Sequence, residues 1–528
     1  MKRLLQFAVL LAFLAQGCTK SLDYKSPAGP DGGEPGDTTS TTSTTLATYA
    51  WPSGLDESRR STVYQVTLTQ GDTSVEIPVF QNVCPSYQAG YMNMTTTDQN
   101  PLNIFAGRSI SWANFSFSAP VTVEVKVIDT GKVPVDAANT HIIPTRYGIS
   151  AAVRDNVVTF TISQPGQCSV EIGANGYKNG LMIFANPMES NPPTTASDGY
   201  AVLDRASAAS VANVPSTKTG LYFKAGVHDI GVYTVPANIK NIYLEGGAWV
   251  YGALELQGRP DVKIFGRGVL SSDRLNYRQA YCIEGVNGSD RMTIDGITVA
   301  DKRYFAIRLI SVSDTISWVK VIGGWVYNTD GIVAWDGSYI HNCFSWANDD
   351  NIKAYRSGVK FEDMVLWQLN NGGAIQMGWQ DPYSENIEIR RVDILHGEWN
   401  KDDFNRGVLC LVGNRYGYAG SDVYIKNFLV EDLVTETTMP LIWRITPDAA
   451  VAGNICTVNG IVMRNWNVKM NTAASGYANH IVGISASQPI QGVEFDNVVM
   501  NGVKLTSSNW QTQGKFTDFS NTDTPTFN

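Results

Sequence analysis

The stretch WVYNTDGIVAWDGSYIHNCFSWANDDNIKAY, from Trp325 to Tyr355, consists of short apolar runs separated by polar or glycine corners. The same strand–corner–strand pattern recurs around it, in MTIDGITVAD from Met292, ISWVKVIGGW from Ile316 and VKFEDMVLW from Val359. With SYIHNCFSW inside the opening stretch, successive repeats start 24, 22 and 21 residues apart. This spacing is too short for a strand-plus-helix crossover and is typical of one turn of a parallel β-solenoid, and no helical periodicity accompanies it.

Later repeats start 28 and 36 residues apart, which predicts loops that protrude from one side of the coil and wall a cleft. Residues 48–195 have a different pattern, because segments such as STVYQVTL, VTVEVKVI and NVVTFTIS alternate apolar and polar positions between Gly, Asn, Asp and Pro clusters. Such segments predict an antiparallel β-sandwich. The expected fold is therefore all-β, with a β-sandwich over 48–195 and a parallel β-helix over 196–528.

The N-terminus has the features of an export signal. Residues 1–17 combine two basic residues with an apolar run, and LAQGC, ending at Cys18, resembles the lipobox of bacterial lipoproteins. Residues 18–47 are rich in Pro, Gly, Ser and Thr, as expected of a flexible tether after a lipidated Cys18. We expect a lipoprotein on the outer membrane or cell surface of a Gram-negative bacterium, with membrane contact only through this anchor; the alternative is an ordinary signal peptide with a chance cysteine.

Charge and cysteine content exclude several classes of protein. The net charge of −9, without a run of basic residues, argues against nucleic acid or an anionic membrane as a partner and disfavours strongly anionic polymers as substrates. No Cys or His spacing suits a metal, so we expect no metal, and we also expect no cofactor. We expect the protein to be a monomer. Cys84 and Cys168 are the candidate disulfide, although six buried free thiols fit equally well.

Three acids in the opening stretch are the candidate chemical site. Asp349 and Asp350 follow Asp330 by 19 and 20 residues, so on a solenoid they return to nearly the same angular position. Crowded carboxylates separate their pKa values, and acid-catalysed glycosidic cleavage needs one protonated and one ionised carboxyl group. The competing interpretation is that Asp at a solenoid corner only satisfies turn backbone groups.

Tryptophan is concentrated around these acids. Seven of the thirteen Trp, at positions 318, 325, 335, 346, 367, 379 and 399, fall within 82 residues. Indole faces stack on sugar rings, so this concentration favours a saccharide cleft, although we assign about half of these residues to packing.

Several blocks of sequence resemble glycoside hydrolase family 49, the dextranases and isopullulanases. They are YNTDGI, NDDNIKAY, GGAIQMGW over 372–379, and the segment 221–254, so that the similarity covers roughly residues 200–400. The resemblance implies a β-sandwich followed by a right-handed parallel β-helix, in agreement with the pattern of repeats. Polygalacturonases share the NTDG and Asp–Asp features, but their Gly-His-Gly and Arg-Ile-Lys blocks are missing here, so a neutral α-glucan is the expected substrate.

The resemblance also implies roles for particular residues. Asp349 would be the general acid, and Asp330 and Asp350 would position and deprotonate the attacking water in an inverting hydrolysis. The residues expected to bind substrate are Asn328, Lys353, Tyr355, Gln376, Trp379 and Trp335. Inversion predicts a separation of roughly 6.5–9.5 Å between the acid and the base.

The expected activity is hydrolysis of α-1,6 linkages in dextran or a related α-glucan. The alternatives are a β-helix that binds glycan without cleaving it, a structural solenoid, and a hydrolase of the same fold acting on pullulan or polygalacturonate. For Asp402 and Asp403 the alternatives are acids that shape a subsite and exposed loop charges, and we expect exposed loop charges.

Overall fold

A computed structural model describes residues 45–84, 104–378, 383–403, 405–412, 422–447 and 455–528. These residues belong to one compact unit, Thr38–Asn528. The expected signal peptide, Cys18 and Trp379 lie outside the described residues. Within the described ranges, no helix has the length and hydropathy needed to cross a membrane.

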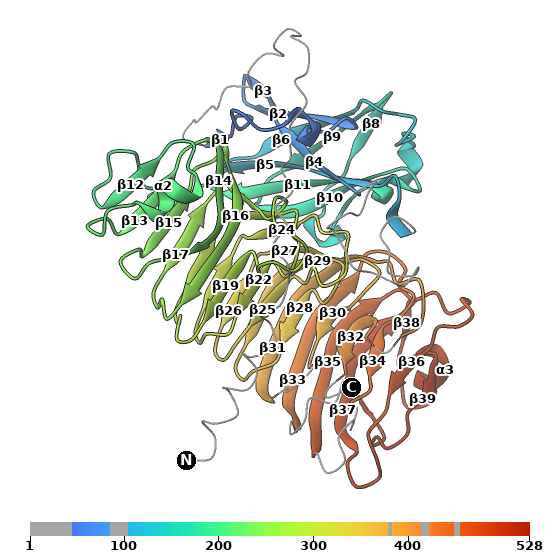
Figure 1. The fold of residues 1–528 in the computed structure, drawn as a ribbon. Coiled ribbons are helices and arrows are strands. Elements are labelled where there is room, and N and C mark those ends of the chain that lie inside the picture. The colour runs from blue at the N-terminus through green and yellow to red at the C-terminus, as the bar shows by residue number, and fades with distance from the viewer. Residues whose placement is uncertain (1–44, 85–103, 379–382, 404, 413–421, 448–454) are drawn as a thin grey trace, which may run out of the picture. The chain divides into compact units, whose positions relative to one another are not determined.

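The first part of the described chain is a sandwich of two sheets (Figure 1). Alternation explains the inner face, since Val121, Val123, Val125 and Val127 of one strand are buried between more exposed polar residues. Most pairs are antiparallel, but β5 (Ser109–Phe117) and β11 (Asn179–Pro187) are parallel. The other strands of the first sheet are β1 (Leu46–Thr48), β4 (Val79–Val83), β7 (Thr140–Ile143) and β10 (Gly166–Ile172), and the second sheet is formed by β2 (Tyr64–Gln70), β3 (Thr73–Ile77), β6 (Val121–Val127), β8 (Ala152–Arg154) and β9 (Val157–Ile162).

The rest of the chain is a parallel β-helix, in which each strand pairs with the strand one turn later. One face of the coil carries the acids; its strands are β19 (Ile283–Val286), β22 (Ile307–Leu309), β25 (Ile332–Ala334), β28 (Ile352–Ala354), β30 (Gly373–Gln376), β32 (Gly407–Leu411), β34 (Trp443–Ile445), β36 (Asn479–Ile481) and β39 (Phe516–Asp518). We call it the acid face.

The second face begins with the early rungs. Its strands are β12 (Tyr200–Leu203), β13 (Gly220–Phe223), β15 (Asn241–Leu244), β17 (Lys263–Gly266), β20 (Thr293–Asp295), β23 (Thr315–Ser317) and β26 (Tyr339–His341). The third face, which we call the sandwich-facing side, contains β18 (Val269–Ser271), β21 (Thr298–Ala300), β24 (Lys320–Ile322) and β27 (Phe344–Ala347). Two long strands, β14 (Gly226–Thr234) and β16 (Ala248–Gln257), turn the corner between faces.

From β29 (Lys360–Gln368) onward, the second and third faces are joined in single long strands. They are β31 (Tyr383–Gly397), β33 (Val423–Thr435), β35 (Cys456–Val468) and β37 (Ile490–Met500), followed by the short β38 (Val503–Lys504) and β40 (Thr526–Phe527). Helices are short: α2 (Ala208–Ala212), α3 (Trp510–Gln513), and the 3-10 turns Glu57–Arg59, Ala137–Asn139, Thr145–Tyr147 and Gly176–Lys178.

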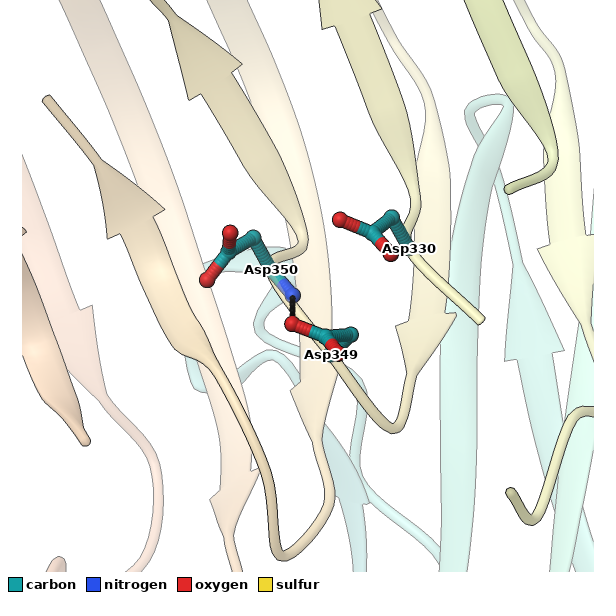
Figure 2. Close-up of side chains that lie close together, drawn as sticks. All are labelled: Asp330, Asp349 and Asp350. Carbon is teal, nitrogen blue, oxygen red and sulfur yellow. Dashed lines mark hydrogen bonds between the residues drawn. The ribbon is translucent and has the colours of Figure 1, made fainter. Parts of the chain in front are cut away.

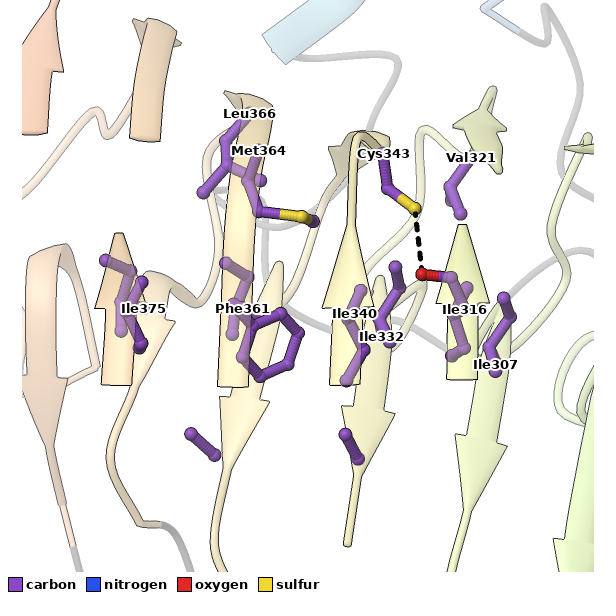
Figure 3. Packing of buried hydrophobic residues seen from close by; sticks show 14 of the residues in the cluster. Ile307, Ile316, Val321, Ile332, Ile340, Cys343, Phe361, Met364, Leu366 and Ile375 are labelled. Atoms are coloured by element: carbon purple, nitrogen blue, oxygen red, sulfur yellow. Dashed lines mark hydrogen bonds between the residues drawn. The ribbon is translucent and has the colours of Figure 1, made fainter. Parts of the chain in front are cut away.

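Ladders of identical or similar apolar residues fill the coil (Figure 3). On the acid face, Ile307, Ile332, Ile352 and Ile375 occupy the same register position on four successive rungs and are fully buried. β-Branched side chains suit this packing because the rungs repeat at about 4.8 Å. The ladders explain why the apolar runs of the sequence recur once per turn, and the predicted all-β fold class is confirmed.

The cysteines correct one expectation. All six described cysteines are free and buried. Cys168 lies in the core of the sandwich and Cys84 in the apolar cluster between the sandwich and the β-helix, so they do not form the candidate disulfide. The alternative of buried free thiols is correct for the described residues.

Candidate active site

The acids lie in turns that lead into two neighbouring rungs of the acid face. Asp330 comes shortly before β25, and Asp349 and Asp350 come shortly before β28. The Gly331 amide donates to the Asp350 carbonyl at 2.9 Å, so the two turns are in register. One carboxylate oxygen from each acid lies within 4.8 Å of the others (Figure 2). The structure therefore brings together the three acids that the one-turn spacing singled out.

Asp349 is surrounded by donors and shielded from water. One of its oxygens accepts from the Asn328 amide at 2.8 Å and from Nδ2 of Asn371 at 2.8 Å, and the other accepts from the Asp350 amide at 3.0 Å. Burial and the neighbouring Asp350 carboxylate nevertheless raise its pKa to about 6. A carboxyl group with this pKa holds a proton in mildly acidic solution and can release it to a leaving group.

Lys353 separates the other two acids. Its ammonium forms ion pairs with Asp330 and, at 3.2 Å, with Asp350. Asp350 also accepts from the Gly373 amide at 3.0 Å and from Nδ2 of Asn405 at 3.2 Å. Asp350 is therefore held in place by one ammonium and by N–H donors from two later segments of the chain.

Asp330 has a different environment from Asp350. It is 1% exposed, and within the described part of the chain neither of its oxygens accepts a hydrogen bond beyond the contact with Lys353. Burial raises its pKa well above the usual value, and Lys353 opposes this shift. The three acids therefore lie in different environments: Asp349 accepts from three N–H groups, Asp350 contacts Lys353 and accepts from N–H donors, and Asp330 contacts Lys353 alone.

The acids form part of the wall of a cleft of about 490 Å³. Earlier rungs and the rungs of the acids contribute the aromatic side chains Tyr281, Tyr304, Phe305, Tyr327, Trp335 and Tyr355. Earlier rungs also contribute Arg278 and Arg308, and later rungs contribute Asn371, Asp403, Asn405 and Arg406. The cleft is thus lined by both aromatic rings and hydrogen-bonding groups.

The residues expected to bind substrate are distributed as follows. Asn328, Lys353, Tyr355 and Trp335 line the cleft. Gln376 is fully buried behind Asp350, where its side-chain amide donates to Oδ1 of Asp350 at 3.4 Å and to Asn405. Substrate binding by these residues stays a prediction.

Most of the tryptophans have a structural role instead. Trp325, Trp346 and Trp367 are fully buried, and they pack with Trp112 of the sandwich in one apolar cluster between the sandwich and the β-helix. Among the six Trp of the predicted concentration that the structure describes, Trp335 is the one that lines the cleft. Five of these six described tryptophans therefore lie outside the lining of the cleft, which is more than the half that we assigned to packing.

Tyrosines take the place of those tryptophans in the cleft, and sequence spacing could have revealed them. Tyr304 and Phe305 precede β22, one turn before Tyr327, which stands at the start of the block YNTDGI. Tyr281 stacks on Tyr304 with ring centroids 4.5 Å apart. The one-turn spacing that aligned the acids also aligns these rings.

Asp402 and Asp403 are also placed differently from the expectation of exposed loop charge. Both are half-buried, and Asp403 lines the cleft. Asp402 forms an ion pair with Arg444 of β34 and lies 4.0 Å from Nε2 of His480 on β36. The acid face thus continues beyond the acids as a polar, ion-paired surface.

The three acids are also the group of described residues whose donor atoms lie close enough together to hold a cation. The Lys353 ammonium already contacts two of them and supplies positive charge at that position. Lys353 thus supplies one positive charge beside the three carboxyl groups.

The fold and the acid cluster resemble those of a class of protein, the glycoside hydrolases built on a parallel β-helix. Residues 42–178 match the model of the glycosyl hydrolase family 49 N-terminal Ig-like domain. The chain is 25% identical over 430 residues to a dextranase of Arthrobacter globiformis, with 67% of this chain and 66% of the relative covered. It is also 25% identical over 397 residues to an isopullulanase of Aspergillus niger, with 64% and 68% covered.

The solved structure of Dex49A from Penicillium minioluteum has the same fold. The TM-score is 0.76 at 18% identity, and 93% of this chain and 99% of that chain are covered. The resemblance to glycoside hydrolase family 49 is confirmed by these matches. The matched segment spans 66% of the length of the Arthrobacter globiformis dextranase.

Proposed function

We propose that this protein hydrolyses α-1,6-glucosidic linkages in dextran or a related α-glucan, by inverting acid/base catalysis. The observation that carries the proposal is the contrast between Asp349, whose pKa is raised to about 6, and Asp350, which is bonded to Lys353 and to three N–H donors. A protonated and an ionised carboxyl group are what acid-catalysed glycosidic cleavage requires. The similarity to proteins named dextranase and isopullulanase supports an α-glucan as the substrate.

In the proposed reaction, Asp349 gives its proton to the glycosidic oxygen as the bond from that oxygen to the anomeric carbon breaks. A water molecule attacks the anomeric carbon, and its proton passes to Asp350. Asp330 and Lys353 hold this water and keep Asp350 ionised until the transfer. Transfer of a proton between the acids and solvent then restores the starting state.

Two observations bear on stereochemistry in opposite directions. The nearest oxygens of the acids lie within 4.8 Å, which is shorter than the separation of roughly 6.5–9.5 Å expected for inversion. Asp350, however, is 1% exposed and held by Lys353 and N–H donors, so it is poorly placed to attack a sugar carbon as a nucleophile. We therefore retain inversion, and proton NMR of the first product tests it through the anomer released.

The lining of the cleft favours a neutral glycan. Aromatic rings such as Tyr281 and Tyr304 offer stacking surface to sugar rings. Four cations line the cleft, and each has a partner: Arg308 is ion-paired to Glu284 and Lys353 to the acids, the Arg406 guanidinium donates to Asn400 at 3.0 Å, and the Arg278 guanidinium lies over the Tyr304 ring. An uncharged α-glucan fits this arrangement better than polygalacturonate.

The test is release of reducing sugar by the purified full chain from dextran, pullulan and polygalacturonate. We expect release from dextran at rates at least a hundredfold above those of Asp349→Asn. Release from pullulan or polygalacturonate alone would overturn the substrate, and binding of dextran without release would favour the glycan-binding alternative.

We also propose that Cys18 carries a lipid that anchors the protein to the outer membrane, on the basis of the lipobox-like LAQGC. Cys18→Ser should then leave the membrane fraction. Retention of this variant with the membrane would contradict the anchor.

A further inference from the structure

A second buried lysine lies beneath the turns that carry the acids. Lys302 follows β21 on the sandwich-facing side of the coil and is fully buried. Its ammonium donates to the backbone carbonyl of Trp346, three residues before Asp349. The mechanism proposed above does not use this lysine, and none of the sequence blocks contains it.

The turn before Asp330 leaves a path for this side chain. A Cβ atom on Gly324 would lie 2.8 Å from Cε of Lys302, so the absence of a side chain at Gly324 makes room for the lysine. Gly324 has φ of +135°, a conformation that residues with a Cβ rarely adopt. The Thr329 hydroxyl closes the turn by donating to the Val326 carbonyl at 2.6 Å. Lys302 is therefore enclosed between this turn and β27.

Three titratable groups act electrostatically on Lys302, and two of them belong to the active site. They are the carboxyl groups of Asp330 and Asp349 and the thiol of Cys282. Burial raises the pKa of Cys282 to about 11, so this thiol is neutral near pH 7. Asp301, the chain neighbour of Lys302, is ion-paired with Arg59. The two acids are thus the negative charges that the ammonium acts on.

We propose that Lys302 is a positioning residue of the active site, a buried ammonium that stabilises the carboxylate of Asp349 after its proton has been transferred. The inference rests on the proposed function, because it assigns Asp349 as the proton donor. Burial lowers the pKa of Lys302 to about 7, while Asp330 and Asp349 act to raise it. Since coupling between two sites is reciprocal, a change in the charge of Asp349 and a change in the charge of Lys302 affect each other equally.

Lys302 and Lys353 therefore act from two sides. Lys353 contacts Asp330 and Asp350 from the cleft, where the water is activated. Lys302 lies on the inner side and acts on the acid that donates the proton. Removal of the Lys302 ammonium should raise the pKa of Asp349 without changing the surface of the cleft that the substrate contacts.

The test compares Lys302→Met with a matched control, Lys320→Met. Lys320 is also fully buried, and its ammonium donates to the side chain of Asn186 and to two backbone carbonyls on the sandwich-facing side. With Lys302→Met we expect kcat to fall about tenfold, KM to change less than twofold, and the alkaline limb of the pH profile to move up by about 0.5–1.5 units. Lys320→Met should lower stability without moving this limb.

A second readout does not depend on activity. Carbon NMR of protein labelled at aspartate carboxyl groups reports the titration of Asp349, and Asp349→Asn identifies its signal. The proposal requires this titration to move to higher pH in Lys302→Met and to stay in place in Lys320→Met. A wild-type protein that cleaves none of the glycans would overturn the proposed function, while the titration would still decide the role of Lys302.

An unchanged titration of Asp349 in a folded Lys302→Met protein would overturn the proposal. Since that variant leaves the Trp346 carbonyl without its donor, Lys302→Gln, which keeps an N–H group, serves as the second variant. If neither variant folds while Lys320→Met does, Lys302 is required for the structure itself, and its assignment as an electrostatic partner of Asp349 is wrong.

Discussion

The backbone amide of Gly331 donates to the carbonyl of Asp350 at 2.9 Å, and this bond joins the turn of one acid to the turn of the other two. The next amide, that of Ile332, donates to the Asn351 carbonyl at 2.8 Å. The separation of the acids is thus set by the pairing of neighbouring rungs, which repeat at about 4.8 Å. Backbone changes at these turns should therefore lower activity, as changes in the carboxylates do.

Asp349→Asn tests the proton donor. We expect kcat to fall by about 10²–10⁴-fold with little change in KM, because an amide cannot supply the proton. In the wild type, activity should decline as the pH rises through about 6, since the donor must be protonated and burial raises the pKa of Asp349 to about 6. Steady-state kinetics from pH 4 to 8 measure both effects.

The control for this variant is Asp363→Asn, an acid at a left-handed corner of the coil that is ion-paired with Arg391. It should keep wild-type kinetics. An Asp349→Asn protein with full activity would assign the proton donor elsewhere.

Lys353→Met tests the balance of charge around the water. Without the ammonium, Asp330 and Asp350 are buried acids with no cation between them, and loss of one partner of a buried ion pair costs about 3–5 kcal/mol. The pair should then bind protons more readily. The acidic limb of the pH profile should move up by at least about one unit, and the loss of stability should be smaller at pH 5 than at pH 8.

Urea unfolding at both pH values checks the stability of this variant. Lys360→Met is the control, because Lys360 is exposed and its ion pair with Glu388 spans 3.5 Å. Equal losses of stability at the two pH values would contradict the proposal that the Lys353 ammonium stabilises the carboxylates of both Asp330 and Asp350.

Gly372→Ala tests whether backbone packing holds the acids in place. Gly372 has φ of +78°, and a Cβ on it would lie 2.3 Å from the carbonyl carbon of Asp349. Gly358 has a similar φ of +67°, but its Cβ would meet nothing closer than 3.8 Å. Both alanines carry the cost of a left-handed backbone, about 1–2 kcal/mol, so the additional loss in Gly372→Ala measures the steric clash.

We expect Gly358→Ala to keep wild-type kcat and Gly372→Ala to lose at least tenfold, because the turn carrying Asp349 must move to admit the Cβ. Thermal unfolding and dextran hydrolysis measure the two effects. Equal kcat values and equal losses of stability in the two variants would show that the turn carrying Asp349 admits the Cβ without a steric clash.

The sequence predicted the parts of the site that depend on the repeat. One-turn spacing aligned Asp330 with Asp349 and Asp350, because the rung pairing that fixes them is the same pairing that creates the apolar repeat. The same spacing could have aligned Tyr304 with Tyr327, but these side chains are uncharged, so they do not stand out in the sequence as a cluster of acids does.

Other parts of the site could not be predicted because they depend on contacts far apart in the chain. Trp346 and Trp367 alternate with strand residues as wall residues do, and only the sandwich that packs on them decides that they are buried. Asn405 reaches Asp350 from a longer inter-rung segment. The ion pair of Asp402 could not be predicted either, because its partner Arg444 lies on a later rung.

Asp314→Asn tests the pH dependence of stability at a site remote from the cleft. Asp314 is buried at a corner, where it accepts from the Met292 amide at 2.8 Å and from the Ser311 hydroxyl at 2.7 Å. Desolvation outweighs these bonds and raises its pKa from 3.8 to about 6. Between these values the folded state holds a proton that the unfolded state has released, so the stabilising contribution is complete below about pH 4 and is lost as the pH rises through 6.

An asparagine keeps the acceptor for the Met292 amide and does not titrate. The wild type should therefore lose on the order of 3 kcal/mol relative to Asp314→Asn between pH 4 and pH 7.5 in urea unfolding. Asp336→Asn is the control, since Asp336 also accepts a backbone amide, that of Ser357 at 2.9 Å, but is only half-buried. A difference between wild type and Asp314→Asn that is the same at both pH values would contradict the raised pKa, because a group that does not titrate in this window contributes equally throughout it.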